Sequence, residues 1–395
     1  MPPRILSRAA WVAAVVGFLA AVLAGCGPLP AAPVPATDSA SGPGTRRIAI
    51  VASERSAGGV RLVAIDEHGD RQFELVQPAA VAARDTNPAV SPDGRWIVFA
   101  SSRDRPIDQT SLWIAPAGIA APPRRLTEAA AGANVIDTHP AWLPDGRAIV
   151  FASTRAGGGY DLWQLAIHDG APGALVQLTH GAGHEVTPAV AADGTIVYAA
   201  VTPDEQHHEI ETHLEERAPD GTIRVVTRGP ADSSPAVSPD GRQLVFARPV
   251  VHDGKPDSEL WLMPRGAPGR PGPVPGQLID AARPLVNLPL TDESGPVWSR
   301  DGRFVFATSV LRGADGHVVF SSIIHIDTRE TPPVARILED RVGAIVRLTP
   351  AMTATPLDPA VLHGDPEYLT ELAKIMTQLI ERARAEATAP APRGD

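Results

Sequence analysis

The sequence predicts an all-β fold: a six-bladed β-propeller whose blades are four-stranded antiparallel sheets. Three observations lead to this prediction. A short motif recurs five times, roughly every fifty residues, which is a spacing typical of repeat architectures. Each copy is followed by short apolar runs with strand-like composition and no helical periodicity. The segments before the first copy and after the last supply the strands of one more unit.

The repeated motif begins with proline and contains an Asp-Gly turn. Asp-Gly between two β-rich runs favours a hairpin, because glycine accepts positive φ without steric cost. A proline before the turn fixes φ and keeps its missing N–H out of the strand ladder. The copies are PAVSPDGR from Pro88, PAWLPDGR from Pro140, PAVAADGT from Pro188, PAVSPDGR from Pro235 and PVWSRDGR from Pro296.

Each unit continues with an apolar strand, such as residues 96–100, and then a strand with a central aromatic residue, such as Trp113. A blade of this kind cannot bury both of its faces alone, so the blades are expected to stack around an axis. An open β-sandwich is the alternative, and it would lack the fixed repeat. We expect the units to close at Leu-Thr pairs, namely Leu126-Thr127, Leu178-Thr179, Leu290-Thr291 and Leu348-Thr349.

The two ends of the repeat region are expected to meet in one blade. Residues 48–51, 62–65 and 73–76 provide strands two to four of a blade that lacks its first strand. Residues 358–362 (Asp-Pro-Ala-Val-Leu) are a weakened copy of the motif, which we interpret as the missing strand; a loop is the alternative. Pairing of the two ends would leave no open sheet edge. The predicted propeller spans residues 47–363.

The motif, the Leu-Trp strand and the Leu-Thr pair together resemble the TolB-like propeller repeats, also called WD40-like or PD40 repeats. The resemblance covers about residues 48–362. It implies a β-propeller of the bacterial cell envelope that binds a protein or peptide partner without catalysing a reaction.

The N-terminus has the layout of a secretory signal. Arg4 and Arg8 precede an apolar stretch at residues 9–23, and the segment Leu-Ala-Gly-Cys at residues 23–26 resembles a bacterial lipobox. The resemblance implies cleavage after residue 25 and acylation of Cys26, the only cysteine of the chain. Acyl chains would hold the protein on a membrane. Because Gly27 stands where an aspartate favours inner-membrane retention, the resemblance indicates the outer membrane, facing the periplasm. An uncleaved membrane anchor is the alternative.

Two further segments flank the propeller. Residues 26–46 are rich in Pro, Ala, Ser and Gly, which predicts a semi-extended tether. Residues 364–386 predict an amphipathic helix, with Asp365 as its cap and Pro366 in its first turn. This helix could pack on the propeller or dock a partner. Residues 387–395 are expected to be a disordered tail.

Composition excludes several classes of function. The formal net charge is −10, which opposes binding to nucleic acid. The chain has no P-loop, no dinucleotide fingerprint and no G-x-S-x-G nucleophile elbow. We therefore expect no cofactor. We also expect a monomer, and the resemblance to TolB-like propellers implies an envelope protein or peptide as the partner.

An acidic residue stands three positions before each motif proline. If the opening strand of each blade is innermost, these carboxylates would ring one mouth of the axial channel and attract a cation or a basic peptide. The structural alternative is that each acid accepts N–H bonds from the neighbouring blade. Residues 104–109 and 252–257 would add loops to this surface. The predicted partner-binding residues are Asp85, Asp137, Glu185, Asp232 and Glu293.

Histidines suggest a second candidate function. His139, His180 and His184 lie near the motif copies and could hold a divalent metal, since imidazole is a common ligand. Some polysaccharide lyases resemble the same repeat family and use channel histidines around a cation. The alternative to an interaction module is therefore a metal-dependent glycan lyase or hydrolase acting in the channel. A purely structural spacer is a third interpretation.

Overall fold

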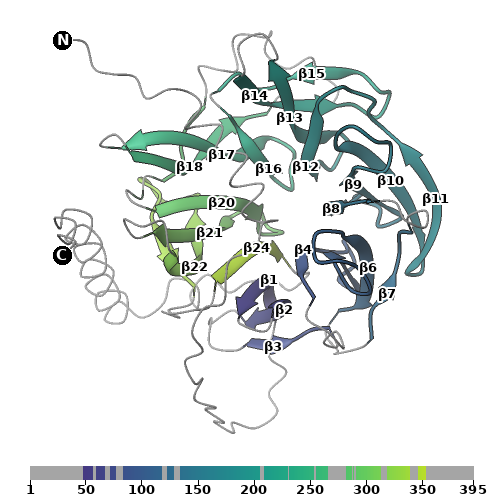
Figure 1. The fold of residues 1–395 in the computed structure, drawn as a ribbon. Coiled ribbons are helices and arrows are strands. Elements are labelled where there is room, and N and C mark those ends of the chain that lie inside the picture. The colour runs from purple at the N-terminus through teal and green to yellow at the C-terminus, as the bar shows by residue number, and fades with distance from the viewer. Residues whose placement is uncertain are drawn as a thin grey trace, which may run out of the picture.

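The strands of this protein form six four-stranded antiparallel sheets that are arranged as blades around a central axis (Figure 1). The fold is seen in a computed structural model. It describes residues 48–352 except 57–58, 67–71, 77–82, 118–121, 129–133, 205–208, 230, 253–254, 266–281, 287, 289–290, 313–317 and 339–345. Within these described residues no helix is long and apolar enough to cross a membrane. The predicted fold class, a six-bladed propeller closed by a C-terminal strand, is confirmed.

The blades follow one another along the chain, and the first combines both ends of the described region. Blade 1 contains β24 (Val346–Met352), β1 (Ile48–Ser56), β2 (Gly59–Asp66) and β3 (Gln72–Glu74). Blade 2 contains β4 (Asp85–Val90), β5 (Trp96–Ser101), β6 (Ser111–Pro116) and β7 (Arg124–Arg125). Blade 3 contains β8 (Asp137–Trp142), β9 (Ala148–Ser153), β10 (Asp161–His168) and β11 (Ala171–Gln177).

The other three blades repeat the same order. Blade 4 contains β12 (His184–Val190), β13 (Ile196–Asp204), β14 (Glu209–Arg217) and β15 (Ile223–Val225). Blade 5 contains β16 (Ser233–Val237), β17 (Gln243–His252), β18 (Lys255–Pro264) and β19 (Arg283–Pro284). Blade 6 contains β20 (Thr291–Trp298), β21 (Phe304–Arg312), β22 (Val318–Asp327) and β23 (Ala335–Ile337).

The strand that carries the motif proline is the innermost strand of its blade, as predicted. Strands β4, β8, β12, β16, β20 and β24 pack against one another around the axis (Figure 1). The apolar cores lie between neighbouring blades. Between blades 2 and 3, for example, Val98 and Leu112 pack with Phe151 and Leu165, and all four side chains are buried. Each blade therefore buries its two faces against its neighbours.

The inner strands of blades 2 to 6 bend at the residue before their motif proline. The residues Asn87, His139, Thr187 and Ser234 have φ of 50° or 51°, and Gly295 has φ of 58°. The strand pairing shifts register at the same place in each blade. Proline disfavours the right-handed helical region for the residue before it and cannot donate to the ladder, so a bulge is the compatible conformation. The motif thus sets the path of the chain along the axis.

The Asp-Gly turn joins the inner strand to the second strand, at the opposite end, in blades 2 to 6. Gly94 has φ of 73°, which glycine adopts without strain. The Asp93 carboxylate accepts bonds from the Ser91 hydroxyl, at 2.6 Å, and from the Arg95 amide, at 3.0 Å. These two bonds and the Arg95 side chain lower the pKa of Asp93 to about 2. In the other four motif turns the aspartate likewise accepts a bond from the amide two residues after it.

The closing strand lies earlier in the chain than predicted. Strand β24 pairs with β1 (yellow beside purple in Figure 1), and Ile50 faces Met352 in the register. The place assigned to residues 358–362 is therefore taken by Val346–Met352, and residues 358–362 lie outside the described residues. Within β24, Pro350-Ala351 occupies the position of the motif Pro-Ala. It is a sixth copy that lacks the Asp-Gly turn.

Two of the predicted Leu-Thr pairs do not close a blade. The residue that closes a blade donates its backbone amide to a carbonyl of the third strand. In blade 2, Leu126 donates in this way to the Leu112 carbonyl at 2.8 Å. In blades 5 and 6 this bond is made by Leu285 and Leu338 instead. Thr291 is the first residue of β20, and Leu348-Thr349 lies within β24. Any buried aliphatic residue can make this contact, so the dipeptide alone does not identify it.

Several predicted segments lie outside the described residues. They are the signal segment, Cys26 and the tether (1–46), the C-terminal helix (364–386) and the tail (387–395). These assignments stay predictions.

Candidate functional site

The five predicted carboxylates lie where the inner strands begin, all at the same end of the propeller axis. Asp85 and Asp137 are the first residues of β4 and β8, and Glu185 is the second residue of β12. Asp232 directly precedes β16, and Glu293 is the third residue of β20. Four of these residues, all except Glu185, expose 3 % or less of their surface. The shared position was predicted from the sequence, whereas the burial was not.

Three of the buried acids are paired with an arginine from the second strand of their own blade or from the loop after it. The shortest N–O distances are 2.5 Å for Arg103–Asp85, 2.6 Å for Arg155–Asp137 and 2.6 Å for Arg248–Asp232. Each guanidinium also lies over a phenylalanine ring, at 5.9 Å from Phe99, 5.5 Å from Phe151 and 5.1 Å from Phe246. The ion pair and the ring contact together fix each arginine.

Hydroxyl groups link two of the acids to the preceding blade. Thr127 accepts a bond from the Leu112 amide at 2.8 Å and donates to Asp137 Oδ2 at 2.6 Å. Thr179 similarly accepts from the Leu162 amide and donates to Glu185 Oε2 at 3.0 Å. The acids therefore do link neighbouring blades, but their partners are hydroxyl and guanidinium groups and not the backbone N–H groups considered above.

Glu293 is a buried acid without an arginine partner. The Ser309 hydroxyl donates to Glu293 Oε1 at 3.0 Å, while Oε2 has no hydrogen-bond partner among the described residues. Burial raises the pKa of Glu293 well above its usual value, and the charges of Asp257 and Asp292 raise it further. Burial likewise raises the pKa of Asp257 to about 6. A buried carboxyl group in this environment favours its neutral form.

Glu185 differs from the other four acids because it is partly exposed. The Glu185 amide donates to the Tyr160 carbonyl at 2.7 Å, next to Asp161, and Glu215 lies on β14 of the same blade. Burial raises the pKa of Glu185, the Thr179 hydroxyl opposes this, and the charges of Asp161 and Glu215 raise the pKa again. Asp161 itself is buried, and its Oδ1 has no hydrogen-bond partner in the described part of the chain.

The candidate metal-binding histidines are not brought together into a site. His139 is in the bulge of β8, with Nδ1 3.1 Å from the Thr138 hydroxyl. His184 begins β12, and its Nδ1 accepts a bond from the Tyr160 amide at 3.2 Å, while His180 is exposed. Within the described residues no three His, Cys, Asp or Glu side chains form a group that could hold a metal ion.

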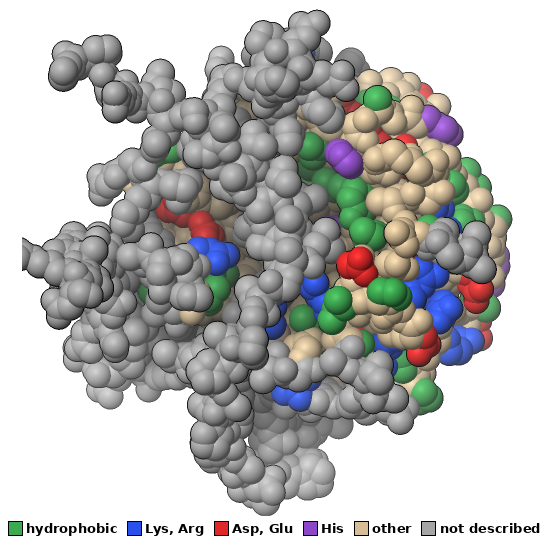
Figure 2. Space-filling model, in the orientation of Figure 1, with side chains coloured by type: hydrophobic (Ala, Val, Ile, Leu, Met, Phe, Trp, Pro, Cys, Tyr) green, Lys and Arg blue, Asp and Glu red, His purple; other side chains and the backbone are tan. Residues whose placement is uncertain are grey.

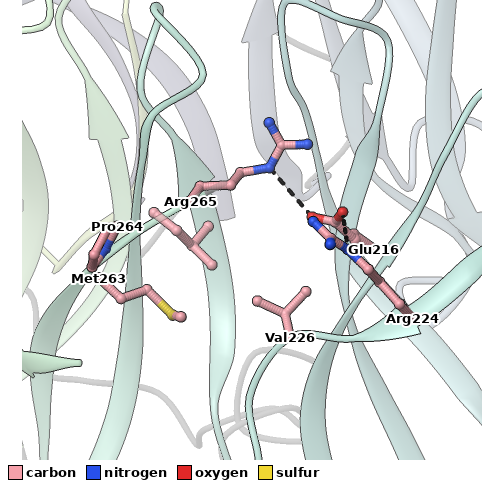
Figure 3. Close-up of a pocket in the computed structure, with 7 residues that line it drawn as sticks. Glu216, Arg224, Val226, Met263, Pro264 and Arg265 are labelled. Carbon is pink, nitrogen blue, oxygen red and sulfur yellow. Dashed lines mark hydrogen bonds and ion pairs between the residues drawn. The ribbon is translucent and has the colours of Figure 1, made fainter. Parts of the chain in front are cut away.

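A small pocket lies between blades 4 and 5 (Figure 3). Its floor is apolar, with Val226 and Met263, and Glu216 lies between two arginines. Arg224 forms an ion pair with Glu216, and Arg265 Nε lies 3.3 Å from Glu216 Oε2. Its charged groups satisfy one another, which is the arrangement expected of an interblade link.

The described residues of the two segments predicted to join the surface lie at the same end as the carboxylates, because the second strand of each blade runs back toward it. In the loop at 104–109, Gln109 Nε2 donates to Asn134 Oδ1 at 2.9 Å, and Ile107 is exposed. At the tip of β17 and β18, His252 Nε2 lies 2.7 Å from Glu259 Oε1. On the face drawn in Figure 2, acidic and basic side chains lie close together over the described part of the surface.

The family described as the TolB beta propeller domain matches residues 41–263, which is more than half of the chain. The chain belongs to the TolB β-propeller domain family. The resemblance inferred from the PD40-type motifs is thereby confirmed. A comparison of this TolB-family chain with curated protein sequences finds no match.

Solved structures share the fold of this TolB-family chain at low sequence identity. TolB from Acinetobacter baumannii superposes with a TM-score of 0.54 and 14% identity, covering 79% of this chain and 68% of that chain. The Kuenenia stuttgartiensis hydrazine synthase gives a TM-score of 0.58 and 14% identity, covering 79% of this chain and 47% of that chain. The similar structures thus include an enzyme, and a shared propeller fold does not by itself assign an activity.

Proposed function

We propose that this chain is a non-enzymatic interaction module of the bacterial envelope, held on a membrane through Cys26 and binding a protein or peptide at one mouth of its channel. Membership in the TolB β-propeller family supports an interaction role. The binding end is the one where the inner strands begin. It carries the five acidic positions and the loops at 104–109 and 252–257.

The observation that carries this proposal is the contrast between Glu185 and the other acids. Asp85, Asp137 and Asp232 are buried and neutralised by arginines, so they stabilise the mouth and shape it. Glu185 is partly exposed, and no arginine or lysine among the described residues forms an ion pair with it. A partner can reach this carboxylate without displacing an existing ion pair.

The proposed cellular location rests on the N-terminal segment. A signal cleaved after residue 25 would leave Cys26 as the N-terminus, acylated on its sulfur and its amine, and acyl chains contribute about 0.8 kcal/mol for each buried CH₂ group. The tether at residues 26–46 would hold the propeller away from the bilayer. We place it on the outer membrane, facing the periplasm, as a monomer.

Site-specific photocrosslinking tests the proposal. A photoreactive amino acid at the exposed His180, beside the acidic end, should capture a defined envelope protein in intact cells. The matched control is the same substitution at the exposed Asp145, in an Asp-Gly turn at the opposite end of blade 3. Equal capture at both positions, or none at either, would refute binding at the acidic mouth.

A further inference from the structure

Blade 4 lacks an arginine at a place where three other blades have one. In blades 2, 3 and 5 a guanidinium pairs with the inner-strand acid and lies over the phenylalanine of the second strand. In blade 4 the acid is Glu185, and Tyr198 occupies the phenylalanine position. Tyr198 follows Val197, which pairs with Ala189, just as Phe246 follows Val245, which pairs with Ala236. The residue opposite Glu185 is Ala200, which brings no charge.

Blade 5 gives the closest comparison, because its second strand is long like that of blade 4. There Ser233 faces Ala247, so that Asp232 and Arg248 form the next pair of the two strands. Arg248 donates to both carboxylate oxygens, at 2.6 Å and 2.8 Å, and lies 4.5 Å from the Trp261 ring. The equivalent of Arg248 in blade 4 is Ala200, and the equivalent of Trp261 is Glu215.

The surroundings of Glu185 are acidic and aromatic. Tyr198 Oη donates to Glu215 Oε2 at 2.8 Å, and His213 Nε2 lies 3.1 Å from Glu215 Oε1. Asp161 from blade 3 adds a buried carboxylate whose Oδ1 is without a hydrogen-bond partner among the described residues. Glu215 is thus bound by Tyr198 and His213, whereas Glu185 and Asp161 have no cationic partner among the described residues, so a cation brought to them would be stabilised.

We propose that Glu185, Asp161 and Glu215 form a socket that receives the guanidinium group of an arginine from the partner. This inference rests on the proposed function and names the side chain by which the partner is recognised. The resident arginines of blades 2, 3 and 5 show the occupant that such a site takes in this fold. Glu293 in blade 6 also lacks an arginine, but it is fully buried and closed to a partner.

Calorimetric titration of the purified full-length protein with N-acetyl-arginine amide tests the socket. Because one side chain supplies the contacts, dissociation constants in the millimolar range are expected, on the order of 1 mM. The citrulline analogue has the same shape without the charge and should not bind. Glu185→Gln should weaken arginine binding by about tenfold or more, since a charge-assisted bond is lost.

A variant that supplies its own arginine to the socket provides an independent test. Ala200→Arg places an arginine at the position of Arg248 and should both abolish binding of the arginine probe and raise the melting temperature. The rise should disappear in the double variant with Glu185→Gln. The socket is overturned if wild type does not bind the probe, or if Glu185→Gln binds it equally well. Arginine binding without photocrosslinks would refute the proposed function alone, and photocrosslinks without arginine binding would refute the socket alone.

Discussion

Breaking the ion pair between Asp232 and Arg248 by replacing one of the two residues should weaken the propeller strongly, because the other is left as a buried charge without its counterion. The Asp232 side chain is fully buried and that of Arg248 is 11% exposed. Arg248→Met keeps much of the packing against Phe246 and Trp261 but leaves a buried carboxylate without its counterion. Losing one partner of a buried pair costs about 3–5 kcal/mol, which is a large part of the stability of a typical domain.

Urea denaturation of wild type, Arg248→Met, Asp232→Asn and the double variant measures this contribution. Each single variant should lose about 3 kcal/mol or more, and the double variant should lose clearly less than the sum, because it leaves no unpaired charge. Arg95→Met is the control, since its pair with Asp93 is exposed, and it should leave stability unchanged. Additive losses, or single losses below about 1 kcal/mol, would refute a stabilising role for the acid–arginine pairs.

Three further predictions concern the anchor, the socket and pH. Cys26→Ser should abolish incorporation of a fatty-acid label and release the protein from membranes; retained label would contradict lipidation. Gly181→Ala should weaken arginine binding, because a Cβ there would lie 2.8 Å from Glu185 Oε1 and displace it; unchanged affinity would contradict the placement of Glu185. Burial lowers the pKa of His139 from 6.5 to about 4, so the unfolded chain binds the extra proton between these values. The free energy of unfolding should therefore fall by at most about 3 kcal/mol as pH drops through this window. His139→Asn, which suits the positive φ that Asn87 adopts, should remove this part of the slope.

The sequence was sufficient to predict the blades because their determinants are local. A motif proline, an Asp-Gly turn and an apolar second strand lie within some fifteen residues of one another, and each acts on its own segment of backbone. The inner position of the proline strand was implied by the resemblance to propellers of this type and not by the local pattern. The same locality explains the error in the closing strand. Strand β24 pairs with β1 from the other end of the chain, so it needs no hairpin and carries no Asp-Gly turn.

The burial of the acids depends on residues that the repeat does not place at one fixed position. In blades 2 and 3 the arginine follows the second strand, as Arg103 and Arg155, whereas in blade 5 Arg248 stands two positions earlier within it. From either position the arginine reaches the equivalent carboxylate of its own blade, because residues two positions apart along a strand point to the same face. A search for arginine at either of these two positions would have found all three pairs. It would also have identified blade 4 as an exception.

This convergence separates the structural acids from the candidate binding acid. Where the blade supplies an arginine, the carboxylate is neutralised within the fold and has no remaining charge to offer a partner. Replacing Asp137 or Asp232 in a binding experiment would therefore change stability together with any effect on binding. Glu185 is partly exposed and receives one hydroxyl bond, from Thr179. Its neutral replacement by glutamine keeps that bond and removes the charge, so a loss of partner binding in this variant would report on recognition and not on folding.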